Sequence, residues 1–333
     1  MFSRGLLMHT ELIIDGLNNF IRHFSTNPKM SLHNEPCGAI AGVLGTIYRG
    51  IEKYKPDKVT VVWEGGGSSR RRALYPDYKA GRKPLSLNRP YSEYEQQNPN
   101  ERDNWDWQLR TLIHLLPMVK VGQVYAEDCE ADDAIAYLCH TKCKDDVKII
   151  VSTDHDYLQL VNDKTRVWAP RKHQNLYDAQ EVKTMFFIPP QNLCVARCFI
   201  GDKSDNIQGI RGISYKYLTK FTNRITGDVP VSIDEVYEEV AEKYLVLKEN
   251  KASLTQIEKI INFPVAEAKL NWQLMNLEFP QLSGTQIQQI IYQHDQPRKM
   301  APKLEVKKFL LQQGLNNIDI DAFGMMVQHT LVT

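Results

Sequence analysis

Three short apolar runs are separated by stretches whose apolar residues recur at helical spacing, and this alternation limits the possible folds more than any other feature. The runs Leu12–Ile14, Lys58–Trp63 and Lys148–Val151 have the length and composition of buried strands. Between the first two, Ala39–Tyr54 places its apolar residues on one helical face. Strands that alternate with helices predict an α/β fold, in which a parallel, doubly wound sheet is flanked by helices.

Weaker patterns continue the same alternation along the chain. Four further elements are expected: the strands Gly122–Tyr125 and Arg166–Trp168, a helix Trp105–Leu116 that ends at Pro117, and a helix Asp132–Cys143. The segment Pro84–Asp103 is polar, contains three prolines and lacks apolar periodicity. We therefore expect it to be poorly ordered.

The chain changes character after Pro189 and Pro190. Leu193–Ile200 has the pattern of an apolar helix, and residues 215–333 are mostly helical in pattern without a strong strand signal. A length of 333 residues is also more than one compact core usually holds. We predict an α/β domain over residues 11–190 and a helical domain over residues 191–333.

Composition excludes several classes of protein. The chain is 42% hydrophobic and 24% charged, which is typical of a globular protein and not of a disordered one. No apolar run approaches the roughly 20 residues that span a bilayer, and residues 1–10 lack the pattern of a signal peptide. We therefore expect a cytoplasmic protein that is not bound to a membrane, with its six cysteines reduced. A zinc site is conceivable, but no pair has the C-x₂-C spacing, so the cysteines are expected to pack in the core.

Carboxylates follow the predicted strands at the points where the strands end. Asp15, Glu64 and the pair Asp154 and Asp156 come just after the three strong strands. The carboxyl ends of parallel strands meet at one edge of a sheet, where ligands of open α/β sheets bind. Further acids stand at a predicted helix start and before the C-terminal region; they are Glu130, Asp132, Asp133, Asp202 and Asp205.

Nine acids from five segments repel one another strongly unless cations lie among them. Oxygen ligands of this kind suit Mg²⁺, with Mn²⁺ as a substitute, and two such ions can clamp and hydrolyse a phosphodiester. Each acid alone also has a structural interpretation, because an acid at a helix start faces the helix dipole and Asp-Gly after a strand is a common turn. Asp133 is the weakest candidate ligand, since it can simply solvate or cap its helix.

A basic segment follows the Glu64 strand directly. Residues 70–89 hold seven basic side chains and one acid, interleaved with tyrosines. Cations neutralise phosphates and tyrosine can stack on a base, so this segment predicts nucleic-acid binding, although a solvated helix face is the alternative. The candidate residues are Arg70, Arg71, Arg72, Tyr78, Lys79, Arg82 and Lys83. Lys79 and Arg82, three residues apart, are expected to face the cleaved phosphate.

Residues 206–214 carry two glycines three apart within an apolar frame. This pattern, in which Gly209, Ile210, Gly212 and Ser214 would form the turn, is similar to the hairpin of a helix-hairpin-helix that offers backbone amides to a phosphate. Lys216 and Lys220 follow at helical spacing and are expected to contact the DNA backbone, with a solvated helix face as the alternative.

As an ordered set, the motifs IIDG, VVWE…YKAGR, EADD, STDHD and GDKSDNIQGIRGIS resemble the 5′-nuclease, or flap endonuclease, superfamily. The layout is most similar to the phage ribonuclease H and 5′-3′ exonuclease branch, and the resemblance covers roughly residues 11–220. It implies a PIN-like fold, a helical arch within about residues 70–110, and a helix-hairpin-helix over residues 201–220. It also implies K⁺ at the hairpin, and base stacking by Tyr78 beside the basic pair Lys79 and Arg82.

The resemblance further implies two divalent metal ions held by seven of the acids, directly or through water: Asp15, Glu64, Glu130, Asp132, Asp154, Asp156 and Asp202. Asp133 and Asp205 match acids of bacterial and phage members. Glu64 stands where most members carry Asp, so the spacing of the metals is expected to differ while activity is kept. His155, between two of the acids, is expected to point away from the site.

The function expected from these features is structure-selective cleavage near 5′ ends, removing RNA primers and 5′ flaps during replication or repair. Expected substrates are DNA with a 5′ flap or single-stranded 5′ end and RNA–DNA hybrids. A monomer that works beside a single-strand-binding protein or a sliding clamp is expected. Three alternatives are a PIN-type single-strand ribonuclease, a non-catalytic DNA-binding module, and a metal phosphatase. The hairpin counts against the first and last, and the near-complete set of acids counts against the second.

Overall fold

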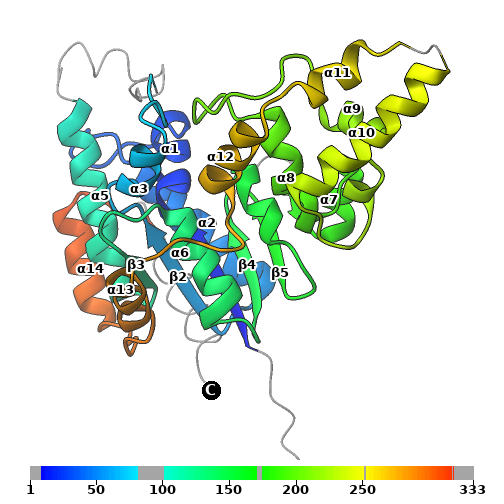
Figure 1. Ribbon diagram of the computed structural model, residues 1–333. Helices are drawn as coiled ribbons and strands as arrows, with labels where there is room; N and C mark the ends of the chain where they lie inside the picture. Colours follow the sequence, from blue (N-terminus) through cyan, green and yellow to red (C-terminus); the bar gives the residue numbers. More distant parts are fainter. Residues whose placement is uncertain (1–8, 82–100, 171–174, 251–252, 317, 319–333) are drawn as a thin grey trace, which may run out of the picture.

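A computed structural model describes residues 9–81, 101–170, 175–250, 253–316 and residue 318. Its centre is a six-stranded sheet in the order β3-β2-β1-β4-β5-β6. The strands are β1 (Thr10–Asp15), β2 (Lys58–Trp63), β3 (Gly122–Tyr125), β4 (Val147–Val151), β5 (Thr165–Ala169) and β6 (Asn175–Tyr177). The first five are parallel, which confirms the predicted α/β fold (Figure 1).

The strand β6 departs from the predicted parallel sheet, because it pairs antiparallel with β5. Only five residues separate Ala169 from Asn175. A parallel crossover needs about a dozen residues or more. A connection as short as this one therefore returns the chain antiparallel.

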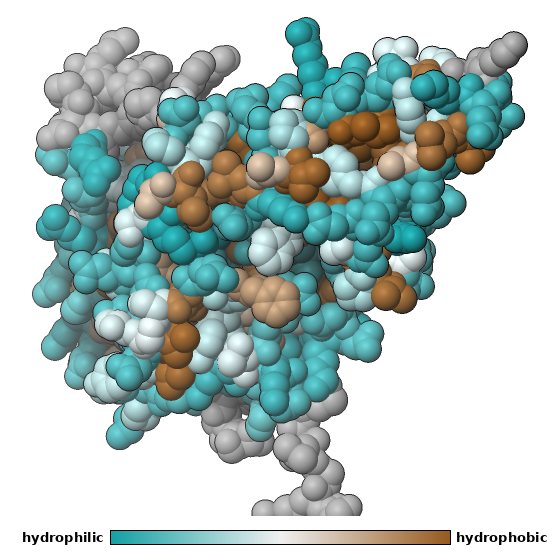
Figure 2. Space-filling model, viewed as in Figure 1, coloured by the Kyte–Doolittle hydropathy of each residue, from teal (hydrophilic) through white to brown (hydrophobic). Residues whose placement is uncertain are grey.

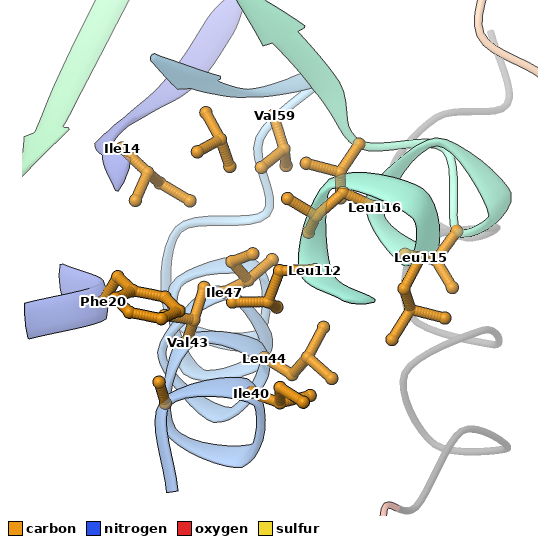
Figure 3. Close-up of a cluster of buried hydrophobic side chains, with 14 of the residues drawn as sticks. Ile14, Phe20, Ile40, Val43, Leu44, Ile47, Val59, Leu112, Leu115 and Leu116 are labelled. Carbon is orange, nitrogen blue, oxygen red and sulfur yellow. The ribbon is translucent and has the colours of Figure 1, made fainter. Parts of the chain in front are cut away.

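Helices cover both faces of the sheet, and the side chains of each strand alternate between two cores. Leu12 and Ile14 pack on the face covered by α1 (Gly16–Thr26), α2 (Gly38–Tyr54) and α5 (Glu101–Met118). Figure 3 shows this core, where Ile47 of α2 lies against Leu112 of α5. Ile13 points the other way, toward α6 (Ala131–Tyr137).

A second group of helices packs around its own core beside the sheet. It comprises α7 (Ala179–Phe186), α8 (Pro190–Ile200), α9 (Tyr215–Phe221), α10 (Ile233–Glu249), α11 (Thr255–Ile261) and α12 (Val265–Met275). Phe199, Leu218 and Val236 are fully buried there. Figure 2 shows the same view: hydrophilic residues cover most of this face, and hydrophobic ones gather along a strip that crosses α12 toward α11.

The chain then returns to the sheet. The helix α13 (Gly284–His294) lies against β3, where the Gln293 side chain accepts from the backbone N–H of Tyr125 at 2.8 Å and donates to its carbonyl at 2.7 Å. The helix α14 (Lys303–Gln312) adds Val306 and Leu310 to the core formed by α2 and α5 (Figure 1). The domain boundary at residue 190 stays a prediction, and this packing gives a reason to count α13 and α14 with the sheet.

Two helices differ from their predicted bounds. The helix predicted at Trp105–Leu116 is α5, which begins at Glu101 and contains Pro117. Proline cannot donate to the carbonyl four residues earlier, and that carbonyl, of Ile113, accepts from Gln123 Nε2 at 2.9 Å instead. The helix predicted at Asp132–Cys143 is α6 followed by a π-helical turn, Leu138–Lys142.

All six cysteines are free thiols and buried, as the core-packing interpretation predicted. Across the described part of the chain, no helix combines the length and apolar character that crossing a bilayer requires.

Candidate active site

Three neighbouring strands place carboxylates at one edge of the sheet. Asp15 is the last residue of β1 and Glu64 follows β2, while Asp154 comes three residues after β4. The strand order β2-β1-β4 makes these ends adjacent. Asp15 is tied to the β4 side, because its Oδ2 accepts from Ser152 Oγ at 3.0 Å and from Tyr157 Oη at 3.1 Å.

Glu64 joins β2 to the start of α6, since its Oε2 accepts from the backbone N–H of Ala131 at 3.0 Å. Burial raises the pKa of Glu64 to about 7, and the charge of Asp132 adds to the shift while the Ala131 hydrogen bond opposes it. Burial likewise raises the pKa of Asp15 to about 6, against the hydrogen bonds from Asn18, Ser152 and Tyr157. Both carboxylates therefore carry charge at a cost that a bound cation would remove.

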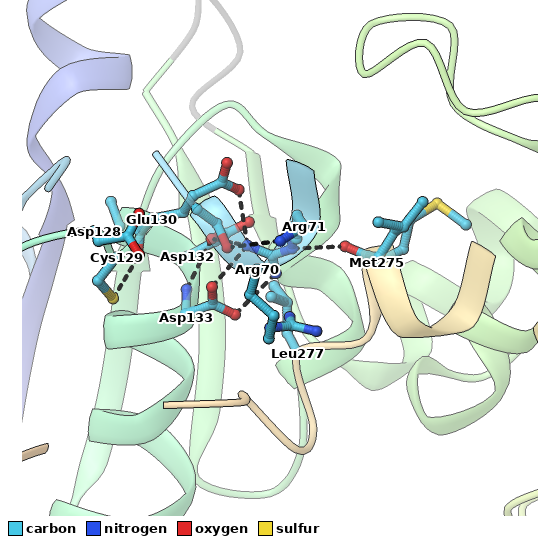
Figure 4. Close-up of polar contacts among 12 residues, drawn as sticks. Arg70, Arg71, Asp128, Cys129, Glu130, Asp132, Asp133, Met275 and Leu277 are labelled. Atoms are coloured by element: carbon cyan, nitrogen blue, oxygen red, sulfur yellow. Dashed lines mark hydrogen bonds and ion pairs between the residues drawn. The ribbon is translucent and has the colours of Figure 1, made fainter. Parts of the chain in front are cut away.

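A second layer of acids is neutralised by basic side chains of this chain. Glu130, 2% exposed, accepts from Arg71 Nη1 at 2.8 Å and from Tyr78 Oη at 2.9 Å, and its Oε1 lies 2.7 Å from Lys79 Nζ. Asp133 binds the Arg71 guanidinium through both oxygens, at 2.7 and 2.8 Å (Figure 4). These contacts tie α3 (Ser69–Leu74) to the first turn of α6.

On the other side of the site, Arg197 of α8 binds two acids at once. Its Nη1 donates to Asp156 and its Nη2 to Asp202. Although burial opposes the shift, hydrogen bonds from Ser204 and the charge of Arg197 hold the pKa of Asp202 below its usual value. Arg197 was not among the residues predicted from the sequence. Its signal was a single charge within the apolar run Leu193–Ile200, which fits a buried arginine that has acidic partners.

These contacts sort the acids into two classes. Among the described residues, Asp15, Glu64 and Asp154 make no ion pair, and Asp132 lies 3.7 Å from Arg71 Nη1. By contrast Glu130, Asp133, Asp156 and Asp202 each pair with lysine or arginine. The acids without a paired cation come from the three adjacent strand ends, so a divalent cation fits this donor set best between β2, β1 and β4.

The segment between α8 and α9 forms a tight hairpin. A two-way backbone bridge joins Asp202 and Ile207, at 2.9 and 2.7 Å, and the N–H of Ile210 donates to the carbonyl of Phe199 at 2.7 Å. A Cβ at Gly209 would lie 2.1 Å from the Ile200 carbonyl carbon, so only glycine lets the hairpin sit on the end of α8.

A family model described as 5′-3′ exonuclease, N-terminal resolvase-like domain, matches residues 10–187. The match covers more than half of the 333 residues, and it includes every strand of the sheet and the acids at its edge. The chain belongs to this family.

Relatives of known type agree with this assignment. Flap endonuclease Xni of Shewanella woodyi is 28% identical over 277 residues, which cover 82% of this chain and all of that protein. The 5′-3′ exonuclease of Aquifex aeolicus is 29% identical over 211 residues, 63% of this chain and 67% of that one. DNA polymerase I of Caldicellulosiruptor bescii is 25% identical over 316 residues, but this chain spans only 34% of its length.

Solved structures share the fold at lower identity. T5 5′-exonuclease with bound zinc ions has a TM-score of 0.60 at 17% identity, with 97% of this chain and 100% of that chain covered. Flap endonuclease-1 of Methanococcus jannaschii has a TM-score of 0.55 at 17% identity, with 98% and 92% covered. These likenesses confirm the predicted PIN-like 5′-nuclease fold.

Within this 5′-3′ exonuclease fold, three residues predicted to touch nucleic acid are buried. Arg71, 1% exposed, also donates from Nε to the Leu274 carbonyl at 2.9 Å. Its side chain therefore makes contacts within the protein interior. Tyr78 is 6% exposed with its hydroxyl on Glu130 and Asp205, which leaves no free ring face for a base. Ile210 belongs to the helical core. This burial is at odds with nucleic-acid contacts of the Arg71 and Tyr78 side chains, whereas Ile210 was predicted only as part of the hairpin turn, and that assignment stays a prediction.

The remaining predicted residues keep exposed or partly exposed positions. Arg70 and Arg72 lie on α3, and Arg72 Nη2 is 3.7 Å from Asp128. Gly212 and Ser214 are exposed in the hairpin, and Lys216 and Lys220 are exposed on α9. Lys79 is partly exposed, and its backbone N–H donates to the carbonyl of Asp205 at 2.9 Å.

Three further predictions have different outcomes. Arg82 and Lys83 lie outside the described residues, as does most of the segment predicted to be poorly ordered. The expectation for His155 agrees with the structure, since its ring packs edge-on against Tyr177 and Phe186, with centroids 6.4 and 6.0 Å away.

Proposed function

We propose that this protein is a structure-selective 5′-nuclease that hydrolyses phosphodiester bonds near 5′ ends of DNA, or of RNA paired to DNA. The supporting observation is the group of carboxylates without a paired cation at the ends of β1, β2 and β4. Asp15, Glu64 and Asp154 come from adjacent strands of a fold shared with 5′-nucleases. No basic side chain of the described chain forms an ion pair with any of the three.

In this proposal Asp15, Glu64, Asp132 and Asp154 hold divalent metal ions, with Mg²⁺ as the physiological ion and Mn²⁺ as a substitute. Bound there, a pair of ions would supply a hydroxide nucleophile and stabilise the leaving oxygen. Four of the five remaining acids pair with the chain's own cations: Arg71 fixes Glu130 and Asp133, and Arg197 fixes Asp156 and Asp202. Asp205 accepts from Tyr78 Oη at 3.2 Å. This division keeps the ligand carboxylates in place.

Lys79 is the residue we assign to the scissile phosphate. Its ammonium lies 2.7 Å from Glu130 Oε1 and 5.0 Å from the centroid of the Tyr78 ring. The side chain is 23% exposed, so it can exchange part of this pairing for a phosphate oxygen at the edge of the acid cluster. A cation there would stabilise the charge that develops on the phosphate during cleavage. Arg82 is proposed to assist it.

The hairpin of residues 201–214 and the lysines of α9 are proposed to hold the duplex part of the substrate. Lys216 and Lys220 are exposed on α9, directly after the exposed hairpin residues Gly212 and Ser214. Their charges would neutralise backbone phosphates, and the hairpin carbonyls would take K⁺. We further propose that the protein acts as a monomer beside a single-strand-binding protein or a sliding clamp.

A cleavage assay with matched variants tests the proposal. The substrates are 5′-flap, nicked and RNA-primed duplexes with Mg²⁺, and the comparison is between the wild type, Asp154→Asn and Asp163→Asn. Asp163 is an exposed acid in the loop before β5, at the opposite end of the sheet. We expect Asp154→Asn to lower the rate by roughly 10²–10³-fold or more, and the control to match the wild type.

Three outcomes would contradict the proposal, the third of them measured on unpaired RNA added to the substrate set. A wild-type protein that leaves all three substrates whole would support the non-catalytic DNA-binding module instead. Equal rates for wild type and Asp154→Asn would remove the metal role of Asp154. Cleavage of unpaired RNA alone would favour the PIN-type ribonuclease.

A further inference from the structure

A second group of metal-binding side chains lies at the opposite end of the sheet from the carboxylate edge. Glu11 is the second residue of β1, Cys143 caps the π-helical turn after α6, and His294 is the last residue of α13. These residues are far apart in sequence, yet all three are buried, with exposures of 3%, 4% and 3%. In Figure 1, α13 lies low, toward the ends where the strands begin.

The three side chains present one oxygen, one sulfur and one nitrogen to a common point. Glu11 Oε2 lies 3.1 Å from His294 Nε2 and 3.3 Å from Cys143 Sγ, and Cys143 Sγ lies 3.7 Å from His294 Nε2. These are the edges of a triangle, and the three ligand atoms lie within 4.8 Å of one another.

The triangle has the size of one face of a tetrahedral zinc site. Zinc–ligand distances of about 2.3 Å to sulfur and about 2.0–2.1 Å to nitrogen and oxygen give edges of about 3.4 Å for N–O, 3.5 Å for O–S and 3.6 Å for N–S. Each observed edge lies within about 0.4 Å of these values. The mixture of thiol, imidazole and carboxylate suits Zn²⁺ and not Mg²⁺.

Lys58 offers a competing interpretation. Its Nζ lies 3.0 Å from both ring nitrogens of His294 and 2.9 Å from the His294 carbonyl, so Lys58, His294 and Glu11 form a polar network by themselves. Cys143 belongs to this network as well, because its thiol donates to Glu11 Oε2 at 3.3 Å, so a hydrogen-bonded thiol and a metal-bound thiolate are the two interpretations that an experiment must separate. A cavity of about 440 Å³ adjoins Glu11, His294 and Lys58, and gives the lysine room to withdraw.

We propose that Glu11, Cys143 and His294 bind one Zn²⁺ ion, with water from the adjoining cavity as the fourth ligand. The ion would join β1, the turn after α6 and the end of α13, and so fasten the returning C-terminal segment to the sheet. The thiol proton of Cys143 leaves when the metal binds. This site is independent of the nuclease centre proposed at the other end of β1.

Cobalt substitution tests the site separately from the acidic cluster. The full-length protein is stripped with a chelator and titrated with Co²⁺, and the near-ultraviolet band of thiolate-to-cobalt charge transfer is recorded. The Cys129 thiol near the acids donates to the Glu130 carbonyl at 3.2 Å and belongs to a hydrophobic core cluster, so the Cys143 site is the one expected to give this band. We expect about one equivalent of Co²⁺ to saturate the band, and added Zn²⁺ to abolish it.

Four variants make the result specific. Cys143→Ser and His294→Gln are expected to remove the band and to weaken zinc binding by at least about 100-fold. Cys139→Ser, at a buried cysteine one turn away, and Asp154→Asn at the other end of the sheet are expected to keep it. Far-ultraviolet circular dichroism reports whether each variant is folded.

The absence of the band from the folded wild type would overturn the proposal and leave the Lys58 network as the interpretation. A band that survives in Cys143→Ser would overturn it as well, because the thiolate would then come from another cysteine. Loss of the band in Cys139→Ser alone would assign the thiolate to Cys139 and likewise contradict the proposed set.

Discussion

At the scale of single residues, ion pairing distinguishes the acids that sequence placed together. The sequence offered nine candidate ligands, with Asp133 the weakest, and in the structure Glu130 and Asp133 pair with Arg71 while Asp156 and Asp202 pair with Arg197. A carboxylate already paired with a buried arginine gains less from a metal ion than one without a paired cation. Charge compensation by the chain itself therefore favours Asp15, Glu64 and Asp154 as metal ligands, followed by Asp132, whose contact with Arg71 is the longest of the three at 3.7 Å.

The Arg71 cluster is expected to dominate the stability of the site. Replacing Arg71 by Met leaves Glu130 and Asp133 buried without their cation, which should lower the free energy of unfolding by about 3–5 kcal/mol. Arg72→Met is the matched control on the same helix, because Arg72 is exposed and its ion pair with Asp128 is long, at 3.7 Å. This variant should change the free energy of unfolding by less than about 0.5 kcal/mol. Urea titration of both variants measures the difference, and equal midpoints would contradict the structural role of Arg71.

Without metal, stability is expected to fall as pH rises from about 4 to about 7. The pKa of Asp15 is raised from 3.8 to about 6 and that of Glu64 from 4.5 to about 7, so the folded state holds these protons more tightly than the unfolded chain. The stabilisation from these two protons is complete at a pH below the unfolded-state pKa values and is lost as the pH rises through the folded-state pKa values. The loss is on the order of 3 kcal/mol for Asp15. Glu11, with its pKa lowered to about 2, acts only below this window.

Urea titrations of chelator-treated protein across this pH range measure the effect. Asp15→Asn should flatten the pH dependence of stability and stabilise the metal-free protein near pH 8. Added Mg²⁺ should raise the stability of the wild-type protein at that pH. A stability that rises with pH between about 5 and about 7 would show that other groups control the titration.

The sequence located Asp15, Glu64, Asp154 and Asp156 because they follow apolar strands, and this placement depends only on local pattern. It misplaced Arg71 because three consecutive arginines occupy a short helix with little apolar periodicity, so nothing local indicates which one faces inward. The burial of Arg71 depends on Asp133 and on the carbonyl of Leu274, which lies 203 residues away in the chain. Contacts of that range leave no periodic signal.

At the scale of elements, apolar patterns predicted the strands well, including the four-residue β3, but not the helix that directly follows β1. β2 has the predicted bounds, whereas α1 was missed because Asp15 and Gly16 were interpreted as a turn. In fact Asp15 is the N-cap of α1, accepting from the Asn18 N–H at 3.1 Å, so the same residue ends a strand and starts a helix. Lys216 and Lys220, predicted at helical spacing after the hairpin, both lie on α9.

The exposed lysines of α9 give a prediction that belongs to this element. Lys216→Ala and Lys220→Ala should each weaken duplex binding on catalytically inactive Asp154→Asn protein, and each should reduce the salt dependence of binding by about one released counterion. Lys164→Ala, in the loop before β5 at the far end of the sheet, is the control. Fluorescence anisotropy across a salt series measures the slope. An unchanged slope in both α9 variants would place the duplex elsewhere.

At the scale of the whole molecule, the C-terminal helices pack on the sheet, and no local sequence pattern predicted this packing. The region after residue 215 was predicted to be mostly helical, and it is, but its last helices leave the helical core and pack on the sheet. Leu310 and Leu315 lie among residues of α2 and α5, more than 190 residues earlier in the chain. The sheet core is therefore complete only when the C-terminal segment is in place.

Adjacent leucines on α14 test this dependence. Leu310 is 1% exposed and Leu311 is 59% exposed, so the two positions share composition and helix but differ in burial. Leu310→Ala should lower the free energy of unfolding by about 2–5 kcal/mol, because it opens a cavity beside α2 and α5, whereas Leu311→Ala should change it by less than about 0.5 kcal/mol. If α14 only rested on the surface, both variants would unfold at the same urea concentration. A single cooperative transition in Leu310→Ala, shifted for probes on the sheet and on α14 alike, would show that the segment and the sheet unfold together, since elements of one core lose their packing in one step.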